Sequence, residues 1–233
     1  MHRSDVALLI DFDGTISEKD VMDMLVQHLA GDALVELEQH FRNGELTHGE
    51  LNQKLSKLIK SSREDLIEYL NKNVQLRDGF LELYAFCKNN RIPLIVLSAG
   101  WDIYINFTLD KFQISHCEWT PEVLQSKDYI VGVVSNRLVQ TDHESWQVEL
   151  RKDMGMCDLS SPCKGTLARE LISLGYTELI CAGNGNNDLC MAQEAKWVFA
   201  RDSLAKVCTR DGISFQFLTS FKQILDLLKQ ELK

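Results

Sequence analysis

Residues 6–15 of this 233-residue chain read VALLIDFDGT, and this segment decides how the rest of the sequence is interpreted. Its first half, Val6 to Ile10, is an uninterrupted apolar run of strand length, as expected for a parallel strand buried on both faces. Asp11 and Asp13 follow directly, and residues two apart on extended backbone point to the same side. The segment therefore predicts a core strand that presents two carboxylates at its carboxyl end.

Similar apolar runs recur along the chain and alternate with helical periodicity. The run 94–97 ends in Ser98-Ala99-Gly100, and the run 179–182 ends in the Gly/Asn-rich segment 183–188. We further expect helices at 79–89, 101–112 and 164–174, and strands at 130–134, 146–150 and 197–200. This alternation predicts an α/β fold with a Rossmann-like, doubly wound parallel sheet, whose ligands bind at the carboxyl ends of the strands. The polar strand ends should therefore meet in one pocket.

A helical insertion interrupts this pattern directly after the first strand. Apolar residues recur at helical spacing over some fifty positions, roughly three to four per two turns. Thr47 and Glu50 have the spacing of a helix N-terminal capping box. We therefore expect residues 1–17 and 76–233 to form a catalytic core, with residues 18–75 as a small helical cap.

Composition and charge narrow the range of partners. The chain has 25 Lys and Arg residues against 34 Asp and Glu, a net charge of −9, and so lacks the basic excess that nucleic-acid binding requires. No apolar run approaches the roughly 20 residues that cross a bilayer, and the N-terminal run is too short for a secretory signal. We expect a cytoplasmic protein with neither nucleic acid nor membrane as a partner. The oligomeric state stays open, a homodimer being one alternative.

The chain contains seven cysteines, an odd number, and no Cys-x-x-Cys pair. Several of them lie in segments that look like core strands or helices, so reduced, buried thiols are the favoured interpretation. A zinc site that uses Cys157 and Cys163 is the weaker alternative, because no complete ligand set is recognisable around them.

The paired aspartates suit phosphoryl transfer, because one carboxylate can attack phosphorus while the other moves a proton. Alone, such a pair is more often found in a solvated turn. The other predicted strand ends and helix starts supply what the reaction needs: the Ser98 hydroxyl, the Gly100 amide and the Lys164 charge for phosphate oxygens, and oxygens near Asp188 for a metal ion. Each has an ordinary explanation, such as a turn or a solvated lysine. Their combined order favours the catalytic interpretation.

In this order the residues resemble the four motifs of the haloacid dehalogenase superfamily. The matching segments are Asp11 to Thr15, Ser98, Lys164, and Gly183 to Asp188. The helical insertion is similar to the small cap of the phosphoserine phosphatase-like branch of that superfamily. Within this branch, the segments 77–80, 135–137 and 199–202 look most like the phosphatases of 2-hydroxy-3-keto-5-methylthiopentenyl-1-phosphate.

The resemblance implies a phosphatase with Mg²⁺ as cofactor and a small phosphorylated metabolite as partner. Asp11 would be the nucleophile and Asp13 the general acid and base. The residues implied to bind the substrate and its phosphate are Thr15, Asp20, Ser98, Ala99, Gly100, Lys164 and Asn187. The implied metal ligands are Asp11, Asp13 through its carbonyl oxygen, Asn184 and Asp188. Asp20 has an equally good structural interpretation as a helix N-cap.

The fourth motif departs from the family pattern, Gly-Asp-Gly-x-x-Asp, because Asn184 stands in place of its first aspartate. The change removes one negative charge from the expected metal site. Since magnesium prefers charged oxygen ligands, we expect Asn184 to coordinate through its side-chain oxygen but to bind the ion less tightly. Asp188 would support the site directly or through water.

The function that the sequence favours is magnesium-dependent hydrolysis of a small phosphomonoester through an aspartyl-phosphate, because a helical cap can close over a compact substrate and exclude water. Two alternatives remain open. One is a catalytically weak or silent relative that binds a phosphorylated ligand or a protein partner, for which Asn184 is the support. The other is a phosphotransferase or mutase that shares the aspartyl-phosphate intermediate.

Overall fold

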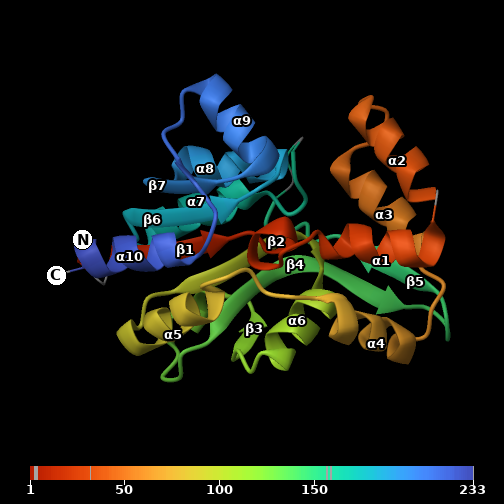
Figure 1. Ribbon diagram of the computed structural model, residues 1–233, viewed down its shortest axis with the longest axis horizontal. Helices are drawn as coiled ribbons and strands as arrows, with labels where there is room; N and C mark the ends of the chain where they lie inside the picture. Colours follow the sequence, from red (N-terminus) through yellow and green to blue (C-terminus); the bar gives the residue numbers. More distant parts are fainter. Residues whose placement is uncertain (3–4, 32, 156, 158, 233) are drawn as a thin grey trace.

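The computed structural model describes residues 1–2, 5–31, 33–155, 157 and 159–232. Within them, the strands form one sheet in the order β3-β4-β2-β1-β6-β7-β8, and β5 pairs with β4 outside this path. The β4–β5 pair is antiparallel and the others are parallel. The strands are β1 (Val6–Ile10), β2 (Leu94–Trp101), β3 (His116–Glu118), β4 (Val131–Gln140), β5 (Trp146–Glu149), β6 (Glu178–Gly183), β7 (Trp197–Ala200) and β8 (Gln216–Phe217). The predicted α/β fold is confirmed (Figure 1).

The first strand, β1, lies inside the sheet between β2 and β6. Val6, Leu8 and Ile10 pack into the hydrophobic core on one face of the sheet, and Ala7 and Leu9 pack into the core on the other face. All five side chains are fully buried. The prediction of a strand buried on both faces is therefore confirmed. The carboxyl end of this strand fixes the position of Asp11, the next residue.

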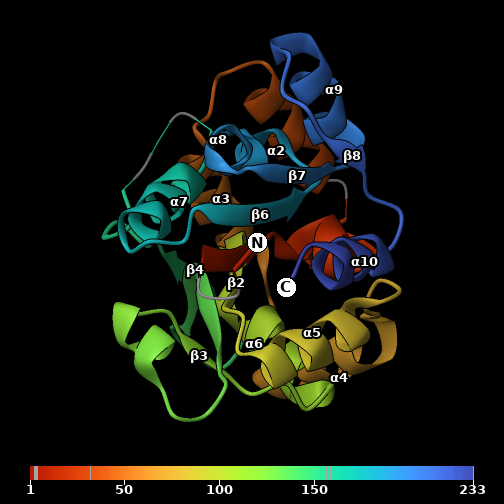
Figure 2. The same cartoon turned by 90° about the vertical axis from the view of Figure 1, so that its left-hand side faces the viewer.

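Helices cover both faces of the sheet (Figures 1 and 2). The core on one face includes side chains of α7 (Lys164–Ser173), α8 (Leu189–Glu194) and α9 (Asp202–Asp211). The core on the other face includes side chains of α5 (Phe80–Asn90), α6 (Asp102–Lys111) and α10 (Lys222–Glu231). Among the described residues, no helix has both the length and the apolar character needed to cross a membrane.

The segment between β1 and α5 is helical, as predicted. It contains α1 (Val21–Ala30), α2 (Ala33–Arg42), α3 (His48–Leu58) and α4 (Arg63–Asn73). Thr47 forms the expected capping box with Glu50 at the start of α3. The segment is also tied to β5: the Trp146 indole donates to the Ser61 carbonyl at 2.9 Å, and the Val148 amide donates to the Ser56 hydroxyl at 3.1 Å. The insertion is thus fixed to the sheet at points other than its two ends.

Several elements differ from the sequence-based expectations, and the strand expected at 130–134 continues as β4 to Gln140. The second strand does not end at Leu97 but runs to Trp101, with a shift of its register against β4 between these two residues. The small residues 98–100 therefore belong to an irregular strand end rather than to a turn. The elements β3 and β8 were not predicted, because three and two residues are too few to show a period. The helices α8, α9 and α10 were not predicted either.

Candidate active site

The segment after β1 is held against the neighbouring strand. The Asp11 amide donates to the Ala182 carbonyl at 2.9 Å, which extends the pairing of β1 with β6. The next residues, Phe12–Ile16, form an irregular helical turn in which Gly14 has a φ of 67°. A Cβ at Gly14 would lie 2.4 Å from Nδ2 of Asn184, so the turn requires glycine both for its conformation and for its close approach to the fourth motif.

Lys164 lies between two carboxylates, one from each side of the site. Its Nζ donates to Oδ1 of Asp11 at 2.6 Å and to Oδ1 of Asp188 at 2.5 Å. The lysine is the first residue of α7, and its side chain is fully buried. The alternative of a solvated helix-end lysine is therefore wrong, and the ammonium group fixes the positions of both carboxylates.

The loop after β6 wraps around the Asp188 carboxylate. Oδ2 of Asp188 accepts hydrogen bonds from the Asn184 and Gly185 amides, both at 2.9 Å. A Cβ at Gly183 would lie 2.4 Å from the same oxygen, so a side chain there would displace the carboxylate. Asp188 is thus held by backbone donors on one oxygen and by Lys164 on the other.

The second aspartate, Asp13, is held from the β2 side. Its Oδ2 accepts hydrogen bonds from the Tyr104 hydroxyl at 2.6 Å and the Ser98 hydroxyl at 3.2 Å, and its Oδ1 accepts one from the Val21 amide at 3.0 Å. A Cβ at Gly100 would lie 1.6 Å from the Tyr104 hydroxyl oxygen and 2.6 Å from Oδ2 of Asp13. Glycine at position 100 therefore makes room for both groups.

Burial and mutual repulsion change the ionisation of these acids. Burial is the main cause that raises the pKa values of Asp11, Asp13 and Asp20 to about 7, and the nearby Asp188 adds to the effect at Asp11. Burial alone would lower the pKa of Lys164, but the charges of Asp11 and Asp188 outweigh it and raise the pKa. The site holds more carboxylates than this lysine can neutralise, so it favours the binding of a cation.

The donor set at the end of β1 fits a hard cation. The Thr15 hydroxyl donates to Oδ2 of Asp11 at 3.0 Å and lies 3.4 Å from Oδ1 of Asn184, which brings the amide oxygen beside the carboxylate. Mg²⁺ prefers carboxylate oxygens, and it also accepts the neutral carbonyl oxygens of amide side chains and of the backbone. The side-chain oxygens of Asp11, Asn184 and Asp188 therefore lie in one group that could hold such an ion.

The remaining residues expected at the site lie at its edge. The Asp20 side chain accepts a hydrogen bond from the Asp23 amide, so its expected role as the N-cap of α1 is confirmed. The Ala99 carbonyl accepts a hydrogen bond from the Asn136 side chain at 2.8 Å. Asn187 lines a cavity beside the site. The structure thus brings together most, but not all, of the expected residues at one point.

Two side chains that organise the site were not singled out from the sequence. Tyr104 binds Asp13, and only the position of its helix directly after β2 pointed toward the site. Arg77 donates from Nη2 to the Gly14 carbonyl at 2.7 Å and from Nε to the Thr15 carbonyl at 2.8 Å. Arg77 belongs to a segment that supported the family resemblance, and it holds the turn that carries Asp13.

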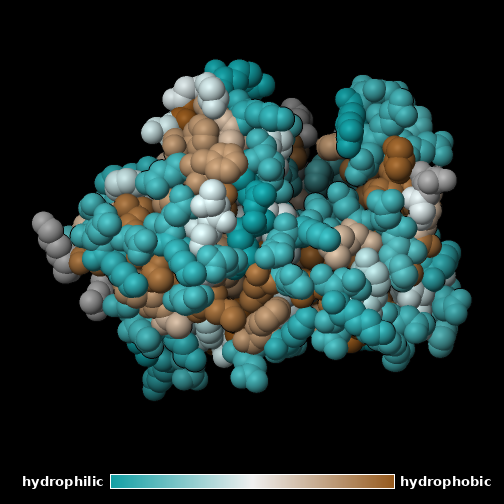
Figure 3. Space-filling model, in the orientation of Figure 1, coloured by the Kyte–Doolittle hydropathy of each residue, from teal (hydrophilic) through white to brown (hydrophobic). Residues whose placement is uncertain are grey.

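A cavity of about 430 Å³ lies between the helical insertion and the loop that follows β6. Its apolar lining comes mainly from the insertion, including Met22, Phe41 and Leu51, and its polar lining includes Arg42 and His48. Burial, followed by the charge of Lys164, lowers the pKa of His48 to about 4. Figure 3 shows the hollow that separates the α2 side of the molecule from the α9 side. The space suits a small ligand with an apolar part.

The fold and the site define a doubly wound α/β enzyme with acidic residues and a lysine gathered at the strand ends. The chain belongs to the haloacid dehalogenase-like hydrolase family, whose family model matches residues 8–193. It is similar to proteins named 2-hydroxy-3-keto-5-methylthiopentenyl-1-phosphate phosphatase. That of Bacillus cytotoxicus is 27% identical, with 96% of each chain covered. That of Geobacillus thermodenitrificans is 28% identical, with 98% of this chain and 97% of the relative covered.

Solved structures support the same fold. A phosphoserine phosphatase described as a phospho-aspartyl intermediate analogue has a TM-score of 0.68 at 18% identity, with 98% of this chain and 99% of that chain covered. A haloacid dehalogenase family hydrolase from Salmonella enterica serovar Typhi has a TM-score of 0.71 at 17% identity, with 98% of this chain and 72% of that chain covered. At these identities the likeness concerns the fold alone.

Proposed function

We propose that this protein hydrolyses a small phosphomonoester with the help of Mg²⁺, through a phosphoryl group carried on Asp11. The observation that carries the proposal is the buried Lys164, which binds Asp11 and Asp188 beside a second acid, Asp13. Family membership and relatives named as phosphatases, matched along nearly their whole length, support it.

In the first step, an oxygen of Asp11 forms a bond to phosphorus while the bond between phosphorus and the substrate oxygen breaks. Asp13, with a pKa of about 7, gives its proton to the departing oxygen. In the second step, Asp13 takes a proton from water as the water oxygen attacks phosphorus and the bond to Asp11 breaks. A pKa near neutrality suits this exchange of roles, because the group is readily protonated and readily deprotonated.

The other residues would hold the transferred group. Ser98 and the Gly100 amide lie on the Asp13 side of the site, and Lys164 lies on the Asp11 side, so donors approach from both sides. A bound Mg²⁺ would neutralise part of the charge on the phosphoryl oxygens. Asn184 provides a neutral oxygen where the family pattern has a carboxylate, and so would weaken the binding of this ion.

The substrate class follows from the cavity next to the site. In this proposal residues 18–75 act as a cap over a core of residues 1–17 and 76–233, and the substrate lies between them. Apolar side chains such as Phe41 and Leu51 suit an aliphatic or thioether end, while Arg42 suits a polar group. A compound such as 2-hydroxy-3-keto-5-methylthiopentenyl-1-phosphate, which appears in the names of the relatives, combines these features.

The test is phosphate release from that compound, from a panel of other small phosphorylated metabolites, and from a chromogenic phosphomonoester, with Mg²⁺ titrated. The Asp11→Asn variant is the matched blank, because it keeps the size of the side chain and removes the nucleophile. We expect magnesium-dependent release by the unaltered protein only. If it never exceeds the blank, hydrolysis is refuted, and the ligand-binding alternative favoured by Asn184 replaces it. Transfer to an added acceptor alcohol would instead indicate a phosphotransferase.

A further inference from the structure

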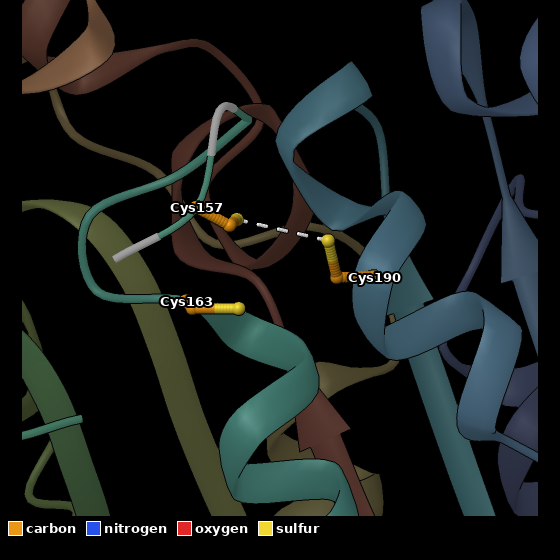
Figure 4. Close-up of side chains that lie close together, drawn as sticks. All are labelled: Cys157, Cys163 and Cys190. Atoms are coloured by element: carbon orange, nitrogen blue, oxygen red, sulfur yellow. Dashed lines mark hydrogen bonds between the residues drawn. The ribbon is translucent and has the colours of Figure 1, made fainter. Parts of the chain in front are cut away.

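Three cysteine side chains from separate parts of the chain converge beside α7 (Figure 4). Cys157 lies in the loop before α7, Cys163 is the N-cap residue of α7, and Cys190 lies in α8. Their sulfur atoms all lie within 4.8 Å of one another, and those of Cys157 and Cys190 are 3.7 Å apart. Cys157 and Cys163 were the candidate pair expected from the sequence, in which nothing marks Cys190 as a third partner.

The separation of the sulfur atoms suits a shared cation. Zinc–sulfur bonds of about 2.3 Å in tetrahedral geometry place neighbouring sulfur atoms roughly 3.8 Å apart. The 3.7 Å between Cys157 and Cys190 matches this value, and Cys163 requires only a modest approach. A disulfide would require about 2.0 Å, so the present arrangement is closer to metal coordination than to a covalent bond.

We propose that Cys157, Cys163 and Cys190 form a binding site for one zinc ion, with the fourth coordination position left to solvent. Sulfur ligands select soft cations, whereas the oxygen ligands around Asp11 select Mg²⁺, so the two sites differ in the ions they bind. The inference does not depend on the proposed function, because it rests only on the three thiols.

Access and neighbourhood support the site. Cys157 and Cys190 are partly exposed, so an ion can reach them from solvent. A bound cation deprotonates a coordinating thiol outright, so the three thiols need not be ionised before the ion arrives. Cys163 directly precedes Lys164, and Cys190 follows Asp188 by two positions. A bound ion would therefore tie together the two segments that carry these residues.

The experiment uses the full-length, reduced protein with Co²⁺ as an optical probe for the zinc site. Excess Mg²⁺ is present to occupy the oxygen site. Thiolate ligands give Co²⁺ a sulfur-to-metal charge-transfer band, and added Zn²⁺ should displace the probe and abolish the band. We expect one equivalent of Co²⁺ to saturate this band. The matched control is Cys117→Ser, which changes a partly exposed cysteine outside the cluster.

We expect the band to persist in Cys117→Ser and to disappear in Cys157→Ser, Cys163→Ser and Cys190→Ser. The zinc affinity of each of these three variants should fall on the order of 100-fold. Loss of a group that only hydrogen-bonds to a metal ligand already lowers metal affinity about 10- to 100-fold, and these substitutions remove a ligand itself. Absence of the band in the unaltered protein overturns the proposal, whether or not the variants fold. A band that survives all three substitutions overturns it as well.

Discussion

The Tyr104 hydroxyl donates a 2.6 Å hydrogen bond to Oδ2 of Asp13, although 91 positions separate the two residues in the sequence. Burial, followed by the charge of Asp20, raises the pKa of Asp13 to about 7, and the hydrogen bond from Tyr104 opposes this rise. The tyrosine therefore influences the pH at which Asp13 loses its proton. It is a positioning residue for the proposed general acid.

Tyr104→Phe should move the alkaline limb of the pH profile of kcat/KM to higher pH. The hydrogen bond stabilises the ionised carboxylate, so its loss raises the pKa of Asp13 further and keeps the acid protonated to higher pH. We expect a shift of about 1–2 units, since a hydrogen bond to a charged group contributes roughly 1.5–3 kcal/mol and one pKa unit corresponds to about 1.4 kcal/mol. The profile is measured at saturating Mg²⁺.

The matched control for this variant is Tyr129→Phe, which removes a hydroxyl that donates to the Ile92 carbonyl away from the site. Its profile should coincide with that of the unaltered protein. An alkaline limb that stays in place or moves to lower pH in Tyr104→Phe would contradict the assignment of Asp13 as the proton donor.

Gly100→Ala should lower kcat at least about 100-fold, because misplacing a catalytic group by about 1 Å has an effect of this size. The new Cβ would lie 1.6 Å from the Tyr104 hydroxyl oxygen, so Tyr104 and Asp13 must both move. The control is Gly49→Ala, whose Cβ meets only the end of the Leu150 side chain, at 3.0 Å. Thermal denaturation separates loss of activity from loss of folding. Full activity in a folded Gly100→Ala protein would refute this account.

The sequence predicted the main parts of the site because parallel strands end at the same edge of a sheet. This rule brought Asp11, Ser98 and Asp188 together from distant positions without knowledge of any contact. The buried pairing of Lys164 with two carboxylates was not predicted, because a lysine at a helix start is solvated in most proteins. How deeply the Lys164 side chain is buried depends on how α7 packs against the sheet.

The contributions of Tyr104 and Cys190 could not be predicted from the sequence for a similar reason. Tyr104 reaches Asp13 from α6, which follows β2 directly, and Cys190 lies near Cys163 because α8 packs beside α7. Periodicity predicts that a helix exists, but the direction in which it packs depends on its neighbours. Side chains that meet through helix packing therefore appear only in the structure.

In the absence of Mg²⁺, the free energy of unfolding should contain a contribution from Asp13 that falls as pH rises. The pKa of this acid is about 7 in the folded protein against an ordinary value of 3.8, so the folded state binds more protons between these values. The contribution therefore decreases from about pH 4 to about pH 7 and is constant above that range. The contribution amounts to about 2–4 kcal/mol, because each unit of the difference in pKa corresponds to about 1.4 kcal/mol.

Asp13→Asn removes this titration, so its stability relative to the unaltered protein should be greater at pH 8 than at pH 5. Denaturant unfolding at both values, with a chelator present, measures the difference. Asp226→Asn changes an exposed acid on α10 and should leave the pH dependence unchanged. A pH dependence that is the same in Asp13→Asn and in the unaltered protein would show that the buried acid is not the source.

Asn184→Asp should have opposite effects on stability with and without magnesium. The new carboxylate would join Asp11 and Asp188 around the single charge of Lys164, so without the ion the added repulsion lowers the melting temperature. With Mg²⁺ bound, the added charge becomes a ligand, and we expect about tenfold tighter binding, or about 1.4 kcal/mol. Calorimetric titration with Mg²⁺ and thermal denaturation in chelator measure the two effects separately.

Asn186→Asp places the same charge on the same loop and serves as the control, because a general effect of charge would appear in both variants. If both bind Mg²⁺ equally tightly, the side chain at position 184 is not a ligand, and the weakened metal site inferred from the fourth motif must be abandoned.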